Sequence, residues 1–283
     1  MAIDYQRLLN YPIPEARQAL RPQDAALYAL SVGLGQDPMD EAQLAFVDYS
    51  RALKVMPSMA AVLAHPGFWL GDPATGVDAV QLVHGEQAIT LHAPLPAEGE
   101  VLGRTRVVDI IDKGPGRGAL LYSQKELTDA RSGALLATTL STTFLRGDGG
   151  FGGPSRPVRP PHPVPDGPPD FTVDLATRTE QALLYRLNGD PNPLHSDPAV
   201  AAKAGFPRPI LHGLCTFGVV THALLKALGA YRVERFRELA LRFSTPVYPG
   251  ETIRVEIWAS GAFRAVSVER GVLVVNHGRA IFD

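Results

Sequence analysis

Short apolar runs separated by turn residues fill much of the second half of the chain. The runs are rich in valine, isoleucine and aromatic residues, which is typical of strands. They cover residues 239–243, 252–258, 264–270 and 272–277. Similar runs in the first half cover residues 101–111, 119–126 and 134–145. The pattern predicts several short strands in each half.

A longer apolar stretch at residues 214–228 has a different pattern. It contains mainly alanine, leucine and valine, and Gly229 follows it, as glycine often follows the end of a helix. We therefore expect a helix that is buried on most sides, and we expect residues 57–63 to start its counterpart in the first half. One central helix wrapped by an antiparallel sheet, occurring twice, predicts an α+β double hot-dog fold.

A segment rich in glycine and proline divides the chain near its middle. Residues 147–153 are mostly glycine, and the run from there to Asp170 contains eight prolines. Proline prevents a regular helix and removes the hydrogen-bond donors that a sheet needs. We expect a first repeat over residues 1–148, a connector over 149–170 and a second repeat over 171–283.

The two halves resemble each other in two places. Residues 28–33 and 185–189 both contain Tyr-x-Leu followed by glycine, and residues 94–100 and 246–251 both contain a proline-rich turn that ends in Gly-Glu. The matches occur in the same order and at similar offsets. They predict a duplicated unit of about 150 residues.

The segment after Tyr185 carries the clearest chemistry. Asp190, Asn192 and His195 are interleaved with Pro191 and Pro193, which stiffen the backbone. A carboxylate and an imidazole at this spacing can converge on one water molecule, since histidine exchanges protons near neutral pH. Asn192 adds a neutral group that can orient that water.

A second motif leads into the predicted helix at Gly213. The first N–H groups of a helix have no partner within it and carry partial positive charge. Glycine lets a ligand approach this backbone closely. Such a donor can stabilise the oxyanion that forms on a thioester carbonyl when a nucleophile adds at Cβ.

These two motifs carry a resemblance to a known family. The pattern Tyr-Arg-Leu-x-Gly-Asp-x-Asn-Pro-Leu-His-x-Asp-Pro at 185–198, followed by Gly-Phe-x-x-Pro-Ile-Leu-His-Gly-Leu-Cys-Thr at 205–216, resembles the signature of the hydratase 2, or MaoC-like, family. Further blocks that resemble the family lie at residues 83–87, 111–114, 149–153 and 242–250. The resemblance implies a double hot-dog subunit, a homodimer, and a first repeat that has lost the catalytic loop and shapes an acyl tunnel.

The resemblance also implies a reaction and residue roles. The reaction is reversible syn hydration of a trans-2-enoyl-CoA to the (3R)-hydroxyacyl-CoA, with no cofactor or metal. Asp190 is expected to take a proton from water and His195 to donate a proton to Cα, with the reverse assignment open. One water can also supply both the hydroxyl and, through the pair, the proton. Asn192 would hold the water and the Gly213 amide would face the thioester oxygen. Four matching positions would line the acyl-CoA site: His84, Gly85, Lys113 and Phe243.

Other polar residues have simpler interpretations. Asp197 is expected to cap a short helix through residues 199–204, and His212 is expected to have a structural role at the helix start. Their spacing with His195 matches no helix-based zinc motif. Residues 114–118 are expected to form a hairpin turn, and Cys215 is expected to be a small core residue.

Net charge, cysteine count and the length of the apolar runs bear on which partners the protein can have. The net charge of −2 gives no nucleic-acid footprint. The single cysteine permits no internal disulfide, no run is long enough for a transmembrane helix, and no signal peptide is visible, so we expect a cytoplasmic protein with no membrane partner. The alternatives are a hot-dog dehydratase or thioesterase acting on another acyl thioester, and a non-catalytic acyl-CoA-binding protein.

Overall fold

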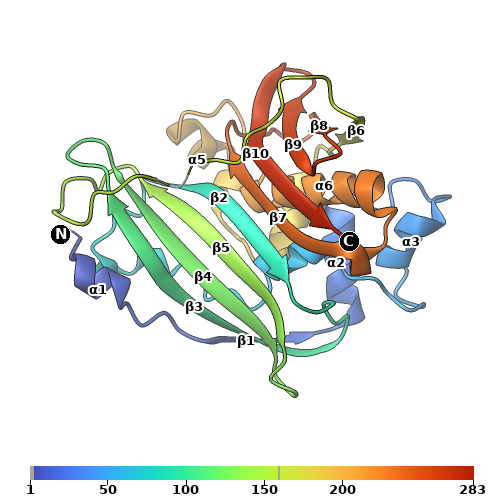
Figure 1. Ribbon diagram of the computed structural model, residues 1–283, viewed down its shortest axis with the longest axis horizontal. Coiled ribbons are helices and arrows are strands. Elements are labelled where there is room, and N and C mark those ends of the chain that lie inside the picture. Colours follow the sequence, from blue (N-terminus) through green and yellow to red (C-terminus); the bar gives the residue numbers. More distant parts are fainter. Residues whose placement is uncertain (1–2, 159) are drawn as a thin grey trace.

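Ten antiparallel strands form one continuous sheet in the described part of the chain (Figure 1). The computed structural model describes residues 3–158 and 160–283. The first half contributes β1 (Ala16–Leu20), β2 (Leu82–Leu91), β3 (Gly99–Asp112), β4 (Ala119–Asp129) and β5 (Leu135–Leu145). The second half contributes β6 (Phe171–Ala176), β7 (Phe236–Phe243), β8 (Thr252–Ile257), β9 (Ala262–Ser267) and β10 (Val272–Phe282).

The strand order repeats in mirror image about the middle of the sheet. The order is β1-β3-β4-β5-β2-β7-β10-β9-β8-β6, so β2 and β7 meet at the centre and β1 and β6 lie at the edges. Each half therefore has the same plan. At the central seam Glu86 of β2 accepts a hydrogen bond from Arg242 of β7 at 2.8 Å and another from Thr142 at 3.0 Å. The two sequence matches between the halves also occupy equivalent places. Residues 28–33 and 185–189 precede β2 and β7, and residues 94–100 and 246–251 follow these strands.

Short helices cover the sheet, and most of them precede the strands that form the seam. The first half contains α1 (Tyr5–Leu9), α2 (Pro22–Ser31), α3 (Glu41–Val47) and the short 3-10 helices η1 (Pro57–Ala61), η2 (Trp69–Gly71) and η3 (Pro73–Thr75). The second half contains α4 (Gln181–Tyr185), η4 (Arg186–Asn188), η5 (Pro193–His195), α5 (Pro198–Lys203), α6 (Gly213–Leu224), the π-helical turn η6 (Leu225–Gly229) and η7 (Val233–Arg235). None of the helices described is long and apolar enough to cross a bilayer.

The predicted central helix exists in the second half but not at comparable length in the first. From Cys215 onward every residue of α6 is buried, as its apolar sequence predicts. In the first half the expected helix is only the five-residue η1. The chain leaves η1 through Ala64, which has a positive φ of 45° and packs on Gly103 of β3. A Cβ at Gly103 would lie 2.2 Å from the Ala64 carbonyl oxygen, so only glycine fits on β3 beside the chain that leaves η1.

The end of the α6 segment also differs from the prediction. Gly229 is not the residue with the left-handed backbone. Ala230 and Tyr231 adopt positive φ angles of 47° and 56° instead. Their strained conformation is held by Tyr231, whose hydroxyl oxygen lies 2.9 Å from His222 Nε2 and whose carbonyl accepts from Lys54.

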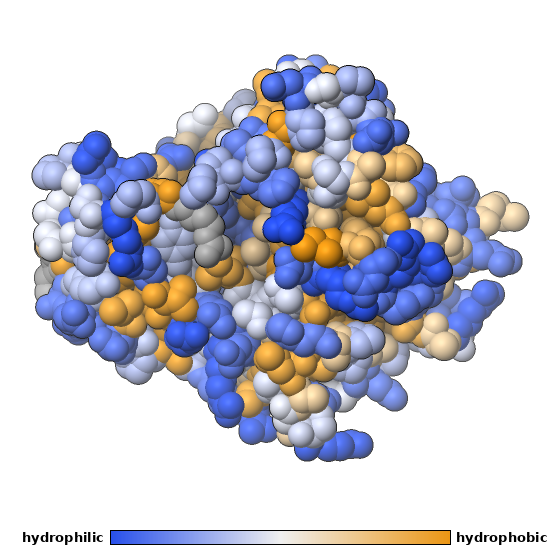
Figure 2. Space-filling view, in the orientation of Figure 1, coloured by the Kyte–Doolittle hydropathy of each residue, from blue (hydrophilic) through white to orange (hydrophobic). Residues whose placement is uncertain are grey.

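The glycine-rich start of the connector is fixed by one carboxylate. Asp112, at the end of β3 and buried, accepts backbone hydrogen bonds from Gly114, Gly150, Gly152 and Gly153 at 2.7–3.3 Å. Among the described residues between β5 and β6 there is no helix or strand. The glycines thus allow the chain to wrap around the buried Asp112 carboxylate. On the face of the molecule shown in Figure 2, hydrophobic residues lie in small patches between hydrophilic ones.

Candidate active site

The loop from Arg186 to Asp197, here called the Asp190 loop, is anchored at both ends. Asn188 donates from its side chain to Ser31 Oγ at 2.9 Å and to the Tyr185 carbonyl at 2.8 Å. Gly189 then turns the chain with a φ of 106°, which a residue with a side chain rarely adopts. At the far end Asp197 caps α5 by accepting from the Ala199 amide at 2.8 Å, as the sequence predicts.

His195 is buried and held in one tautomer. Its Nδ1 lies 2.9 Å from the Ile210 carbonyl oxygen. Because a carbonyl only accepts, Nδ1 carries the hydrogen, and Nε2 is left with a lone pair in the neutral ring. Burial lowers the pKa of His195, and the Ile210 carbonyl and Asp190 only partly oppose this. His195 is therefore a neutral base at rest.

The Asp190 carboxylate is open to solvent and lies beside two imidazoles. Its side chain is 52% exposed, and one oxygen accepts from the Asn192 amide at 3.2 Å. One ligand-type atom from each of Asp190, His195 and His212 lies within 4.8 Å of the others. The structure thus brings the predicted acid/base pair together and adds His212 to it.

The same three groups resemble a metal-binding set, but the geometry of the rings argues against one. The His195 and His212 rings stack with centroids 3.7 Å apart and planes 28° apart. A ring nitrogen binds metal along its lone pair, which lies in the ring plane. Nearly parallel rings direct their lone pairs side by side rather than towards one point, so both cannot ligate the same ion in this arrangement.

Asn192 is partly committed to the backbone. Its side-chain oxygen accepts from the Leu194 amide at 3.0 Å and caps η5. Only the Nδ2 group remains to hold a ligand. Asn192 therefore positions the turn that carries His195 as well as offering one donor to the site.

The start of α6 forms a second wall of the site, with residues from both halves. Gly213 is the first residue of the helix. The ring of Phe243, at the end of β7, lies where a Gly213 Cβ would contact it at 3.6 Å, and its centroid is 5.0 Å from that of His84. Burial lowers the pKa of His84 to about 4, so this ring is neutral. Gly85 lies at a bulge between β2 and β5, where the pairing register shifts.

Lys113 and Cys215 lie apart from this cluster. The Lys113 ammonium lies 4.9 Å from the centre of the Phe144 ring, beside the 114–118 turn, and no hydrogen bond described in the structure joins it to the Asp190 loop. Cys215 is buried, and burial raises the pKa of its thiol, which makes it unreactive. Of the predicted substrate-lining residues, the structure groups His84, Gly85 and Phe243 but not Lys113.

The sequence interpretation missed His65. His65 is exposed, and it lies near enough to Lys125 and Asp190 for both charges to act on its ring. Its Nδ1 accepts from the Gly67 amide at 3.2 Å. The only sequence signal was a histidine before Pro66-Gly67, a pattern that a surface turn would also produce.

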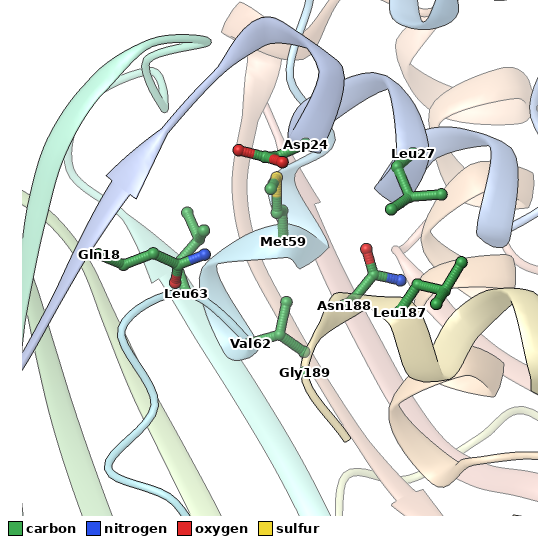
Figure 3. Close-up of a pocket in the computed structure, with 9 residues that line it drawn as sticks. All are labelled: Gln18, Asp24, Leu27, Met59, Val62, Leu63, Leu187, Asn188 and Gly189. Atoms are coloured by element: carbon green, nitrogen blue, oxygen red, sulfur yellow. The ribbon is translucent and has the colours of Figure 1, made fainter. Parts of the chain in front are cut away.

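A cavity of about 180 Å³ opens beside the Asp190 loop (Figure 3). Residues from α2, η1 and η4 surround it, so both halves contribute. Met59 and Val62 of the first half line it on one side, and Leu187, Asn188 and Gly189 of the second half lie beside them. The remaining lining residues are Gln18, Asp24, Leu27 and Leu63.

Two family models match the chain, the MFE-2 hydratase 2 N-terminal domain over residues 19–147 and the MaoC like domain over residues 162–277. The 3-hydroxyacyl-thioester dehydratase Y of Mycobacterium tuberculosis is 46% identical over 86% of this chain and 83% of its own. The chain belongs to the MaoC-like hydratase 2 family. The peroxisomal enoyl-CoA hydratase 2 of Arabidopsis thaliana is a further relative, 36% identical over 90% of this chain and 86% of its own.

Solved structures agree with this family assignment. A MaoC-like dehydratase from Phytophthora capsici superposes with a TM-score of 0.86 and 32% identity over 98% of both chains. A protein of Mycobacterium tuberculosis described as a double hotdog fold, at a TM-score of 0.54 and 15% identity, shares the fold alone. The predicted double hot-dog fold is confirmed. Hydratase and dehydratase name the two directions of one reaction, so this hydratase 2 chain is a hydro-lyase.

Proposed function

We propose that the protein hydrates trans-2-enoyl-CoA reversibly to (3R)-3-hydroxyacyl-CoA, with Asp190 and His195 as the acid/base pair. The observation that carries the proposal is that Asp190 and His195 lie together, with a carboxylate oxygen and a ring nitrogen within 4.8 Å of each other, while the Ile210 carbonyl holds His195 Nδ1. A thioesterase would not need this combination, and a non-catalytic binding protein would not need a histidine with a free, basic nitrogen.

The neutral state of His195 decides how the proton moves. A neutral imidazole must gain a proton before it can act as an acid. We infer that His195 Nε2 takes one proton from water while Asp190 accepts a hydrogen bond from the same water. The hydroxyl then bonds to Cβ, the π electrons move to Cα, and the imidazolium returns its proton to Cα on the same face. This assignment differs from the expectation that Asp190 is the base.

The start of α6 supplies the electrostatic part of the reaction. During addition, negative charge develops on the thioester oxygen as an enolate. The Gly213 amide lies in the first turn of α6, where helix N–H groups lack intrahelical partners. The Phe243 and neutral His84 rings would exclude water around the thioester without adding charge. An N–H group that points at the enolate oxygen stabilises its charge more strongly where uncharged rings exclude water.

The cavity beside the Asp190 loop is the proposed place for the acyl chain. Its apolar walls come from Leu27, Met59, Val62, Leu63 and Leu187. Because η1 is so short, the first half leaves this space next to the loop of the second half. The phosphate-bearing end of CoA would then extend along the surface, where Lys113 stays a candidate contact. A homodimer and a cytoplasmic location stay predictions.

The test follows loss of enoyl absorbance with trans-2-butenoyl-CoA and trans-2-decenoyl-CoA near neutral pH. We expect Asp190→Asn and His195→Gln each to lose about 100-fold or more, as removal of a general acid or base does. An (R)-specific and an (S)-specific dehydrogenase report the product configuration. Asp197→Asn is the matched control, because Asp197 lies on the same loop and only caps α5.

Three results would each contradict the proposal. One is a folded wild-type protein that binds acyl-CoA and hydrates neither substrate. The others are an (S) product, and pair variants that keep the activity of the Asp197→Asn control. Faster hydrolysis of saturated acyl-CoA than hydration of enoyl-CoA would favour the thioesterase alternative.

A further inference from the structure

His212 is a buried ionisable group beside the proposed acid/base pair, and the proposed reaction gives it no step. Only 1% of the residue is exposed, and its Nδ1 has no hydrogen-bond partner among the described residues. Four ionisable groups surround it: Asp190, His195, Arg186 and Tyr185, whose ring centroid is 5.1 Å away. Sequence analysis expected only a structural role for it.

Two contacts connect His212 to both members of the pair. Its Nε2 lies 3.3 Å from the Asp190 backbone carbonyl oxygen and 4.0 Å from the Asp190 carboxylate. Since a carbonyl only accepts, Nε2 carries the hydrogen and donates to Asp190. The other contact is the stack on His195, with ring centroids 3.7 Å apart. One side chain therefore contacts the backbone of the acid and one face of the base.

The surroundings keep His212 neutral. Protonation would place a second N–H, on Nδ1, at a buried position without an acceptor, and a buried unsatisfied donor is costly. It would also place a cation against the ring that must take up a proton. In agreement, burial and the neighbouring His195 lower the pKa of His212 to about 4. A neutral His212 donates to Asp190 without competing with His195 for the proton.

We propose that His212 is a positioning residue, whose neutral Nε2–H holds Asp190 in reach of the water while its ring supports one face of His195. It does not touch the substrate or exchange a proton. The inference rests on the proposed hydratase function, because its effect appears in that reaction. It predicts that the N–H donor of residue 212 matters more than the fit of its side chain.

The matched pair His212→Gln and His212→Met tests this prediction. The two side chains are similar in length, but only glutamine carries an N–H donor near the place of Nε2. We expect His212→Met to lower kcat about 10- to 100-fold, as small displacements of reacting groups do. His212→Gln should recover at least about fivefold of that loss, with KM for both variants within about threefold of wild type because substrate contacts are unchanged.

His222→Met is the control for loss of a buried histidine from the same helix. His222 is also 1% exposed, and its Nε2 contacts the Tyr231 hydroxyl rather than the Asp190 loop. We expect its kcat to stay within about twofold of wild type even if its melting temperature falls, since it makes no contact with reacting groups. His212→Phe, which keeps a ring without a donor, serves if His212→Met does not fold.

The outcomes separate this inference from the proposed function. If glutamine is no better than methionine or phenylalanine, or if all variants of residue 212 keep wild-type kcat, His212 only packs. If His222→Met loses as much kcat as His212→Met, the effect is general destabilisation and the inference fails. If the wild-type protein hydrates no enoyl thioester, the proposed function itself fails, whatever the variants do.

Discussion

The two halves of the molecule share one strand plan but place different elements against it. In the second half the twelve-residue α6 packs on β6, β7 and β8, and its first turn faces the acid/base pair. In the first half the five-residue η1 packs on β2 and β5, and its Met59 lines the cavity that Asn188 and Gly189 border from the second half. The comparison shows that the two halves place elements of different length against the same strand plan, and the proposed function assigns the chemistry to the second half and room for the substrate to the first.

The halves also differ where the repeated Tyr-x-Leu motif lies. In the first half Tyr28 and Leu30 belong to the regular helix α2, and Leu34, which follows the matching Gly33, stands at the position of Asp190. In the second half the helix ends at Tyr185 and the Pro-rich loop follows. The rings of Tyr28 and Tyr185 meet 6.1 Å apart, so the two copies of the motif pack against each other across the centre of the molecule.

The largest effect on the difference between η1 and α6 is expected from substitution of Lys125, which contacts the end of η1. Its buried ammonium donates to the carbonyls of Ala61 and Leu63, the carbonyls that a longer helix would have paired. Burial lowers the pKa of Lys125 to about 7. In the unfolded chain it keeps its ordinary, higher value, so between about pH 7 and 10 the unfolded state binds more protons and stability rises with pH.

We therefore expect the wild-type protein to gain stability relative to Lys125→Met between about pH 7 and 10, by several kcal/mol if the full shift is realised. Urea unfolding of both proteins at several pH values measures the difference, and groups common to both cancel. Parallel stability curves would show that Lys125 is not shifted in the folded state.

The next largest effect should come from Asp112, which ties the connector to the first half. Burial raises the pKa of its carboxyl, but its four backbone hydrogen bonds outweigh burial and hold the pKa below its usual range. We expect Asp112→Asn to lower the free energy of unfolding by about 3 kcal/mol at neutral pH, since hydrogen bonds to a charge are lost. Because a lowered pKa gives stability that is lost as pH falls, the gap should shrink below about pH 4.

Asp109→Asn is the control on the same strand. Asp109 forms a partly exposed ion pair with Arg156, and such pairs contribute about 1 kcal/mol or less. A loss of stability at Asp112 no greater than at Asp109, or one that does not change with pH, would contradict the anchoring role.

A third variant addresses the packing of α6 against the first half. A Cβ at Gly218 would lie 2.4 Å from a Val32 methyl group and 3.1 Å from the Tyr28 hydroxyl. We expect Gly218→Ala to cost about 2 kcal/mol through overpacking, measured by urea unfolding. Gly213→Ala is the stability control, because its Cβ would meet Phe243 at an ordinary 3.6 Å. Equal stability of the two variants would show that the two halves can shift apart at no cost.

Sequence patterns predicted the parts of the molecule that depend on local rules. Seven strands follow from short runs rich in valine, isoleucine and aromatic residues, whereas β1, β2 and β6 were not predicted. The Asp190 loop follows from two prolines that separate an acid from a histidine. The length of η1 does not follow, because residues 57–63 are as apolar as a helix would require, and the residues that contact the end of η1, Gly103 and Lys125, lie far along the chain. The role of His212 likewise depends on a stack with His195 that only the folded structure brings about.

The smallest expected effect tests whether the short η1 makes room for the acyl chain. Met59 lies on η1 and lines the cavity, so Met59→Trp should fill it. We expect activity with trans-2-decenoyl-CoA to fall about tenfold relative to trans-2-butenoyl-CoA, a change of about 1.4 kcal/mol in transition-state binding. Met39→Trp is the control, because Met39 is 84% exposed. If Met59→Trp changes both substrates equally, the chain lies elsewhere, and the difference between the halves does not set substrate length.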